Sequence, residues 1–189
     1  MLRLQRYKPE NLESLTVAFK DIFDESEQPY FEDFQITGPS YIGVDRAGEI
    51  QAFILSSSSP DKIGAYEISY LGVSSRYRRK GYGSRLIELV RDAVGKQGVW
   101  LNVLDSNING CALYKKLGFE QRETFSTETK EKGIIFVYGV CCYHCSKLIP
   151  VKDIRLEGAI VRIELKNNAF DRISETIRVC WQCRTINEH

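Results

Sequence analysis

Short apolar or alternating stretches recur along this chain and are separated by polar turns. They predict strands over residues 2–7, 41–44, 50–55, 66–73, 99–104, 119–125 and 133–140. The second and third stretches flank Asp45-Arg46-Ala47-Gly48, which is typical of a hairpin turn, and a polar loop is expected from Ser56 to Asp61. The pattern therefore predicts a sheet of several short strands.

Apolar residues also return at helical spacing in three places. A first helix is expected to open at Pro9-Glu10-Asn11-Leu12, and a short one is expected from Asn109 to Leu117. The clearest helix lies between them and carries one apolar face, made by Leu86, Ile87, Val90, Ala93 and Val94. Strands and helices thus alternate over most of the chain.

Composition narrows the class of protein. The chain has 189 residues, of which 43% are hydrophobic and 27% charged, and its net charge is +1, all of which is ordinary for a soluble globular protein. The charge gives no drive toward nucleic acid or membrane. Met1 to Arg6 lacks the apolar core of a secretory signal, so we expect an intracellular, cytoplasmic protein, or a nuclear one in a eukaryote or virus.

The most informative stretch is the basic turn between the strand 66–73 and the amphipathic helix. It reads Arg78-Arg79-Lys80-Gly81-Tyr82-Gly83. A strand, a glycine-bearing turn and a helix start together present backbone N–H groups and the positive end of a helix dipole. Because glycine has no Cβ, a diphosphate can approach the main chain closely. The turn is neither a Walker A loop nor a dinucleotide fingerprint, and a basic turn that merely caps a helix is the alternative.

A second motif, Asn107-Ile108-Asn109-Gly110-Cys111-Ala112-Leu113-Tyr114-Lys115-Lys116-Leu117-Gly118-Phe119, follows the strand 99–104. The two motifs together resemble those of the GNAT superfamily of N-acetyltransferases, with Gly110 in place of the usual Ala. The resemblance covers residues 1–140. It implies an α/β fold with a mixed, mainly antiparallel central sheet flanked by helices, and acetyl-CoA as the cofactor. The cofactor-binding residues that it implies are Leu71, Gly72, Val73, Arg78, Arg79, Lys80, Gly81, Tyr82, Gly83, Ser84, Asn107 and Tyr114.

The same resemblance implies direct acetyl transfer to an amine, which must lose a proton before it attacks. Tyr114 is the expected acid, because its place in the motif puts its hydroxyl near the cofactor sulfur. Glu67 is the expected base, by similarity to the histone acetyltransferase branch. Asn102 stands where many N-terminal acetyltransferases have Glu or His, and an amide cannot serve. Tyr66, Tyr70, Asp105 and an ordered water stay open as other bases.

The acceptor is expected to be an amine: a protein lysine, a protein N-terminus or a small polyamine-like amine. For the acidic, aromatic stretch from Asp21 to Phe34, the resemblance implies a wall of the acceptor site, where carboxylates would attract a cationic amine, and a solvated loop is the alternative. Cys111 is interpreted as a small core residue. The sequence does not identify the acceptor or the oligomeric state.

Composition changes at Cys141, and residues 141–189 are expected to form a separate module. Cys142, Cys145, Cys180 and Cys183 form two Cys-x-x-Cys pairs about 34 residues apart, which predicts one structural zinc held by four thiolates. Strand-like segments at 155–165 and 173–179 lie between the pairs. Free thiols, rubredoxin-type iron, and Cys141 or His144 as a substitute ligand remain alternatives.

Two functions of different class therefore compete. The first is an acetyl-CoA-dependent N-acetyltransferase. The second is a catalytically weak adaptor of the same fold that uses the zinc module to bind protein or nucleic acid. Basic residues of the tail are interleaved with carboxylates, which argues against nucleic acid.

Overall fold

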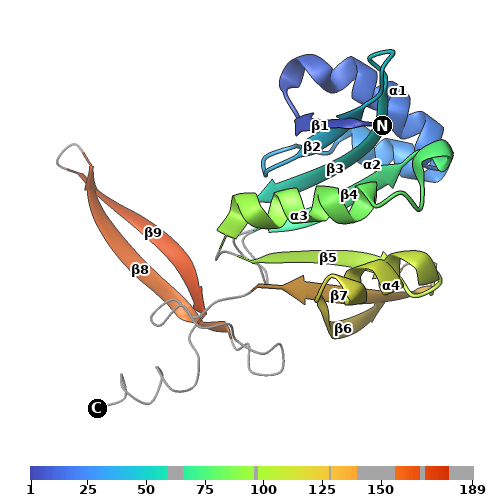
Figure 1. Ribbon diagram of the computed structural model, residues 1–189. Helices are drawn as coiled ribbons and strands as arrows, with labels where there is room; N and C mark the ends of the chain where they lie inside the picture. Colours follow the sequence, from blue (N-terminus) through green and yellow to red (C-terminus); the bar gives the residue numbers. More distant parts are fainter. Residues whose placement is uncertain (59–65, 96–97, 128, 140–155, 167–168, 179–189) are drawn as a thin grey trace.

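The computed structural model describes residues 1–58, 66–95, 98–127, 129–139, 156–166 and 169–178 (Figure 1). A seven-stranded sheet forms the centre, in the order β1-β2-β3-β4-β5-β7-β6. Its strands are β1 (Arg3–Arg6), β2 (Tyr41–Val44), β3 (Ile50–Ser58), β4 (Tyr66–Val73), β5 (Val99–Leu104), β6 (Glu120–Ser126) and β7 (Lys132–Tyr138). The β4–β5 pair is parallel and the other neighbours are antiparallel, so the predicted mixed, mainly antiparallel sheet is confirmed.

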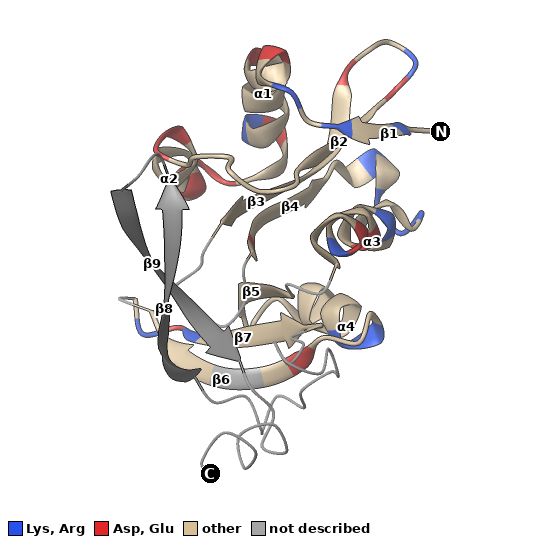
Figure 2. Cartoon of the chain, turned by 90° about the vertical axis from the view of Figure 1, so that its left-hand side faces the viewer, with Lys and Arg blue, Asp and Glu red and all other residues tan. Residues whose placement is uncertain are grey.

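Helices cover both faces of this sheet (Figures 1 and 2). Helices α1 (Leu12–Ile22) and α2 (Gln28–Glu32) belong to one face, and α3 (Tyr82–Val94) and α4 (Ile108–Lys116) to the other. Three single-turn 3-10 helices, η1 (Pro9–Asn11), η2 (Glu25–Glu27) and η3 (Ser75–Tyr77), complete the described helical elements.

Each face has its own apolar core, because the strands alternate their side chains between the faces. On the α1–α2 face, Leu15 and Phe19 pack on Ile42, Phe53 and Leu55. The core on the α3–α4 face is made by Leu86, Ile87, Val90, Ile54, Ile68, Leu101, Tyr114 and Phe136. The sheet is therefore buried on both sides, which explains why its central strands read as nearly continuous apolar runs.

The structure differs from the sequence prediction in two elements of this domain. Strand β3 continues through Ser58 where a polar loop was predicted, because Ser56 pairs with Ile68 and is itself fully buried. The acidic stretch was interpreted as a loop, yet it contains η2 and α2, which the buried ring of Phe31 holds against Phe19 at 4.1 Å between ring centroids.

A second, two-stranded sheet is formed by β8 (Leu156–Lys166) and β9 (Ala169–Arg178), which pair antiparallel from Leu156–Arg178 to Lys166–Ala169. The two strand-like segments predicted in the tail are thus confirmed as strands. All four predicted zinc ligands lie outside the described residues. Among the described helices, none has both the length and the apolar character needed to cross a membrane.

Candidate active site

The two central strands of the sheet part from each other halfway along. In the described chain, β4 pairs with β5 only through Tyr66–Val99, Glu67–Trp100 and Ile68–Leu101. Beyond that point β4 stays paired with β3, and β5 stays paired with β7. The β5-facing backbone groups of β4 from Ser69 onward are therefore left without a strand partner. A buried backbone needs such partners, so an extended ligand with amide groups could take the place of a strand there.

A β-bulge in β4 sits at the point of divergence. Leu55 pairs with Tyr70 and Ser56 with Ile68, which leaves Ser69 as the extra residue. The bulge shifts the alternation of side chains along β4. Ile68, Leu71 and Val73 pack in the α3–α4 core, whereas Tyr70 packs against the aromatic rings of the α1–α2 core. After the bulge, β4 therefore contributes side chains to the cores on both faces of the sheet.

The basic turn and the start of α3 lie at the end of β4, as predicted. Gly81 is the residue before α3 and has φ +83°, a left-handed conformation that favours glycine. The N–H of Arg85 donates to the carbonyl of Gly81 at 3.0 Å, so the N–H groups of Tyr82, Gly83 and Ser84 precede the first helical hydrogen bond. Three backbone donors and a helix dipole therefore meet at this turn, which is the arrangement that binds phosphate.

The fold fixes this turn through side chains on both sides of it. The Nε of Arg78 donates to the carbonyl of Val73 at 3.0 Å, and the Nζ of Lys80 donates to the carbonyl of Arg76 at 2.9 Å. The hydroxyl of Tyr82 accepts from the N–H of Leu2 at 2.8 Å, which ties α3 to the first strand. The turn is consequently held in place by the fold itself.

Helix α4 faces the same opening from β5. The Oδ1 of Asn107 accepts from the N–H of Gly110 at 2.9 Å and caps the helix. A Cβ on Gly110 would lie 2.9 Å from the Asn107 side chain, so the glycine leaves room for this cap. The cap orients α4 so that its Leu113 approaches Gly83 of α3, 3.5 Å from where a Cβ would stand.

Tyr114 of α4 packs in the core on the α3–α4 face. Its side chain is 8% exposed and packs edge-on against Phe119. Burial, with a smaller contribution from Cys111, raises the pKa of Tyr114 to about 12. Within the part of the chain that the structure describes, its hydroxyl has no hydrogen-bond partner. A proton is thus held on a hydroxyl that has no partner among the described residues.

Glu67 lies on the opposite face of β4 from Tyr114, between Tyr66 and Ile68, which both pack in the α3–α4 core. It is half-buried and lies beside Tyr70, whose pKa is raised first by burial and then by the charges of Glu27 and Glu67. Asn102 is exposed on β5, just past the last β4–β5 pair. The predicted base, Glu67, and the predicted acid, Tyr114, therefore do not form one cluster. They lie on opposite faces of the sheet.

The ring of Tyr70 is the functional candidate whose setting the sequence did not reveal. The rings of Phe19, Phe23, Phe31 and Phe34 stand edge-on to it, with centroids 5.1 to 6.1 Å away. These phenylalanines come from α1, α2 and the segments after them, whereas Tyr70 follows the bulge. The many aromatic residues between positions 19 and 34 were visible in the sequence. The sequence did not show that they pack around Tyr70 of β4.

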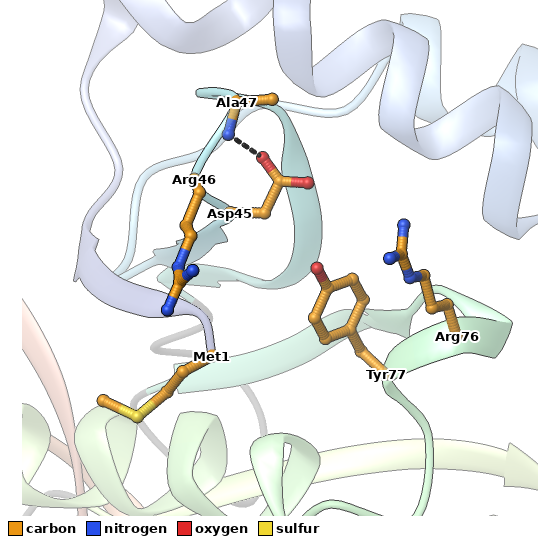
Figure 3. Close-up of a pocket in the computed structure, with 6 residues that line it drawn as sticks. All are labelled: Met1, Asp45, Arg46, Ala47, Arg76 and Tyr77. Carbon is orange, nitrogen blue, oxygen red and sulfur yellow. Dashed lines mark hydrogen bonds between the residues drawn. The ribbon is translucent and has the colours of Figure 1, made fainter.

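A hollow of about 340 Å³ lies elsewhere, between the turn joining β2 to β3 and the η3 turn (Figure 3). Arg46, Arg76 and Tyr77 line it, together with Met1, Asp45 and Ala47. The carboxylate of Asp45 accepts from the N–H groups of Ala47 and Glu49, at 2.9 and 3.1 Å, and so holds the turn. None of the residues predicted to bind the cofactor lines this hollow, so we do not assign the active site to it.

The arrangement of sheet, turn and helix agrees with a known family. The chain belongs to the acetyltransferase (GNAT) family, whose sequence profile matches residues 8–119. The family predicted from the two motifs is thereby confirmed.

Individual relatives cover only part of the chain. It is 33% identical over 96 residues to the [ribosomal protein bS18]-alanine N-acetyltransferase of Escherichia coli (strain K12). The matched stretch covers 47% of this chain and 63% of the relative. The chain is 31% identical over 81 residues to an uncharacterized protein of Mycobacterium leprae (strain TN), 43% of this chain and 20% of the relative. The chain thus spans less than two thirds of these curated relatives.

Solved structures support the same fold. The crystal structure of the ribosomal-protein-S18-alanine N-acetyltransferase from Escherichia coli superposes with a TM-score of 0.62 at 21% identity, covering 79% of this chain and 100% of that one. Arabidopsis thaliana NAA60 in complex with acetyl-CoA gives 0.59 at 24% identity, covering 74% and 100%. At this level of identity the similarity shows the fold alone.

Proposed function

We propose that the chain is an N-acetyltransferase that moves the acetyl group of acetyl-CoA to an amine. The parting of β4 and β5, with the glycine turn before α3, is the observation that carries the proposal. Acetyl-CoA supplies an activated acetyl thioester. The residues present fit it: the N–H groups at the start of α3 suit a diphosphate, and the unpaired edge of β4 suits the amides of pantetheine.

In the proposed reaction, Glu67 takes the proton that the ammonium of the acceptor must lose, directly or through a water. The amine nitrogen then forms a bond to the acetyl carbon as the carbon–sulfur bond breaks. Tyr114, whose raised pKa keeps it protonated at neutral pH, donates its proton to the departing sulfur. The proton that the nitrogen loses as the amide forms passes through solvent and restores the Tyr114 hydroxyl. Because Glu67 and Tyr114 lie on opposite faces, acceptor and cofactor would approach from opposite sides of the sheet.

The acceptor that we propose is an amine of a protein, with an N-terminal α-amine ahead of a lysine. The relative in Escherichia coli is named for an alanine of a ribosomal protein. An α-amine has a pKa near 8 against about 10.4 for lysine, so it places less demand on a base, which matters for a chain with Asn102 on β5. The α1–α2 face also concentrates acidic residues at α2 (Figure 2), where an amine that arrives as a cation is favoured.

The test is a release assay for the CoA thiol with a matched pair of peptides. One peptide has a free N-terminal alanine and no lysine, and the other has a blocked N-terminus and one lysine. We expect turnover with the first to exceed turnover with the second. The reverse order would replace the α-amine by lysine as the acceptor, and no turnover with any amine would favour the adaptor function instead.

We further propose that the four tail cysteines hold a structural zinc. The Leu156–Arg178 pair closes the open end of the β8–β9 hairpin. Cys180 follows Arg178 by two positions and Cys145 precedes Leu156 by eleven, so both Cys-x-x-Cys pairs join the same end of the hairpin. A two-stranded hairpin is marginal alone, and a closed four-thiolate site would supply the missing folding free energy without taking part in acetyl transfer.

A further inference from the structure

Arg91, in the last turn of α3, connects the ends of three elements on the α3–α4 face. Its Nη1 donates to the carbonyl of Leu117, just after α4, at 3.0 Å, and its Nη2 donates to the hydroxyl of Tyr138, the last residue of β7. The guanidinium also lies over the Tyr138 ring, with Cζ 3.4 Å from the ring centroid. A planar group with donors in a fixed geometry can hold both partners at once, which a lysine ammonium cannot do equally well.

The carbonyl that Arg91 holds lies at the end of the helix that carries Tyr114. The N–H of Phe119 donates to the carbonyl of Tyr114 at 3.0 Å, and the N–H of Gly118 donates to the next carbonyl along the helix at 3.0 Å. With Gly118 at φ +83°, these two bonds form a Schellman motif. The carbonyl of Leu117 belongs to the same turn. Its bond to Arg91 therefore anchors the turn that begins at Tyr114.

A row of aromatic rings makes a second connection between Arg91 and Tyr114. The centroids of the Tyr138 and Phe119 rings are 5.3 Å apart, and those of the Phe119 and Tyr114 rings are 5.8 Å apart. A Cβ on Gly118 would lie 3.4 Å from the Tyr138 ring, so the row and the turn pack closely. Because close-packed side chains transmit displacements, a shift of Tyr138 would reach the ring of Tyr114.

We propose that Arg91 is a positioning residue for acetyl transfer, which holds the end of α4 so that the hydroxyl of Tyr114 keeps the orientation in which it protonates the departing sulfur. The inference rests on the proposed function, since it needs Tyr114 as the proton donor. Among the described residues that hydroxyl has no hydrogen-bond partner, so its orientation depends on the packing around the ring. In the same part of the chain Arg91 is half-buried and forms no ion pair, so its contacts are those with α4 and β7.

A double-mutant cycle in the full chain tests whether Arg91 acts through Tyr114. Arg91→Met keeps an apolar stem and removes the guanidinium, and Tyr138→Phe keeps the ring and removes the hydroxyl. Each is made alone and together with Tyr114→Phe. Asp92→Ala, which removes an exposed charge from the same turn of α3, is the control. The measurements are kcat and KM for acetyl-CoA with a lysine-free peptide, acetyl-CoA affinity by calorimetry, and the melting temperature.

We expect Arg91→Met to lower kcat about tenfold and Tyr138→Phe to lower it about threefold, because a misplaced proton donor slows the chemical step. Acetyl-CoA affinity should stay within about twofold, and the control should match the unaltered chain. Together with Tyr114→Phe, neither change should lower kcat further, because the hydroxyl that they orient is already gone. A residue that only supported the fold would lower kcat by the same factor in both backgrounds.

Equal factors in the two backgrounds, or an unchanged kcat in Arg91→Met, would overturn the positioning role and leave the proposed function standing. Unchanged turnover in Tyr114→Phe alone would also overturn it, since Tyr114 would then donate no proton. If Arg91→Met does not fold, the cycle with Tyr138→Phe decides by the same criterion. A lack of turnover by the unaltered chain with any amine would reject the proposed function itself, and this inference with it.

Discussion

At the scale of single residues, the proposed chemistry depends on two side chains, Tyr114 and Glu67, that differ in burial. Tyr114 on α4 is buried against the rings of Phe119, just before β6, and Phe136 on β7, and this burial raises its pKa. Glu67 is half-buried and lies on the face of β4 that carries α1 and α2. Burial of one and accessibility of the other suit a proton donor and a proton acceptor.

For Tyr114, the substitution to Phe should lower turnover by about 10² to 10⁴. Affinity for acetyl-CoA should change little, because the ring stays in the core. With a pKa of about 12, the hydroxyl remains protonated throughout the physiological range, so its contribution should not fall between pH 7 and 9. The measurements are steady-state rates and calorimetry, with Tyr41→Phe as a control in the same core. Unchanged turnover would remove Tyr114 from the mechanism.

For Glu67, the substitution to Gln should depress turnover more at pH 7 than at pH 10, since the acceptor amine is already neutral at high pH. A pH–rate profile with a lysine-free peptide checks this, and Asp105→Asn is the comparison for another proposed base. Full activity of the Gln variant at every pH would show that a different group removes the proton.

At the scale of elements, the position of the site follows from how β4 meets its neighbours. Its glycine at position 72 faces the helix α1, where an added Cβ would lie 2.8 Å from Phe53 Cζ and 3.0 Å from Phe23 Cε2. The close packing of α1 on β4 therefore needs the absence of a side chain. It also supports the aromatic rings around Tyr70.

Gly72→Val should accordingly destabilise the fold by about 1 to 3 kcal/mol through overpacking. Gly83→Val is the matched control, because a Cβ there meets only ordinary contacts, 3.5 Å from Leu113 and 4.0 Å from Leu71. Chemical denaturation of both variants tests the contrast. Equal stability of the two would contradict the packing that the structure shows at Gly72.

Strands, helices and the glycine turn could be predicted from the sequence because their signals are local. The hairpin of β2 and β3 has its turn residues in place, and α3 has an unbroken apolar face. The bulge at Ser69 and the parting of β4 from β5 could not be predicted, because both depend on which distant strands pair. The helix α2 was missed because Phe31 is buried through contacts with distant elements, Phe19 of α1 and Tyr70 of β4.

At the scale of the whole molecule, the chain combines an acetyltransferase domain with a tail that has its own hairpin. The four cysteines that would close this tail lie at its two ends in the sequence. A zinc site there would stabilise the folded tail and would not affect the opening between β4 and β5.

Metal analysis of the purified chain should therefore find about one zinc per chain, with Cys142, Cys145, Cys180 and Cys183 protected from thiol reagents. Cys180→Ser should lower the zinc content and the stability of the tail while acetyl-CoA binding survives. Cys111→Ser is the control, because Cys111 is buried in the α3–α4 core. A metal-free preparation with all four thiols reactive would rule out the site.

The central claim, that acetyl-CoA lies between β4 and β5 with its diphosphate at the start of α3, is tested most directly by calorimetric titration of acetyl-CoA. The side chain of a valine at position 83 would extend toward Leu113 and Leu71, because a Cβ there lies 3.5 and 4.0 Å from them. We expect saturable binding by the unaltered chain, and binding weakened at least about tenfold in a stably folded Gly83→Val variant. Undiminished binding in that variant would contradict the placement.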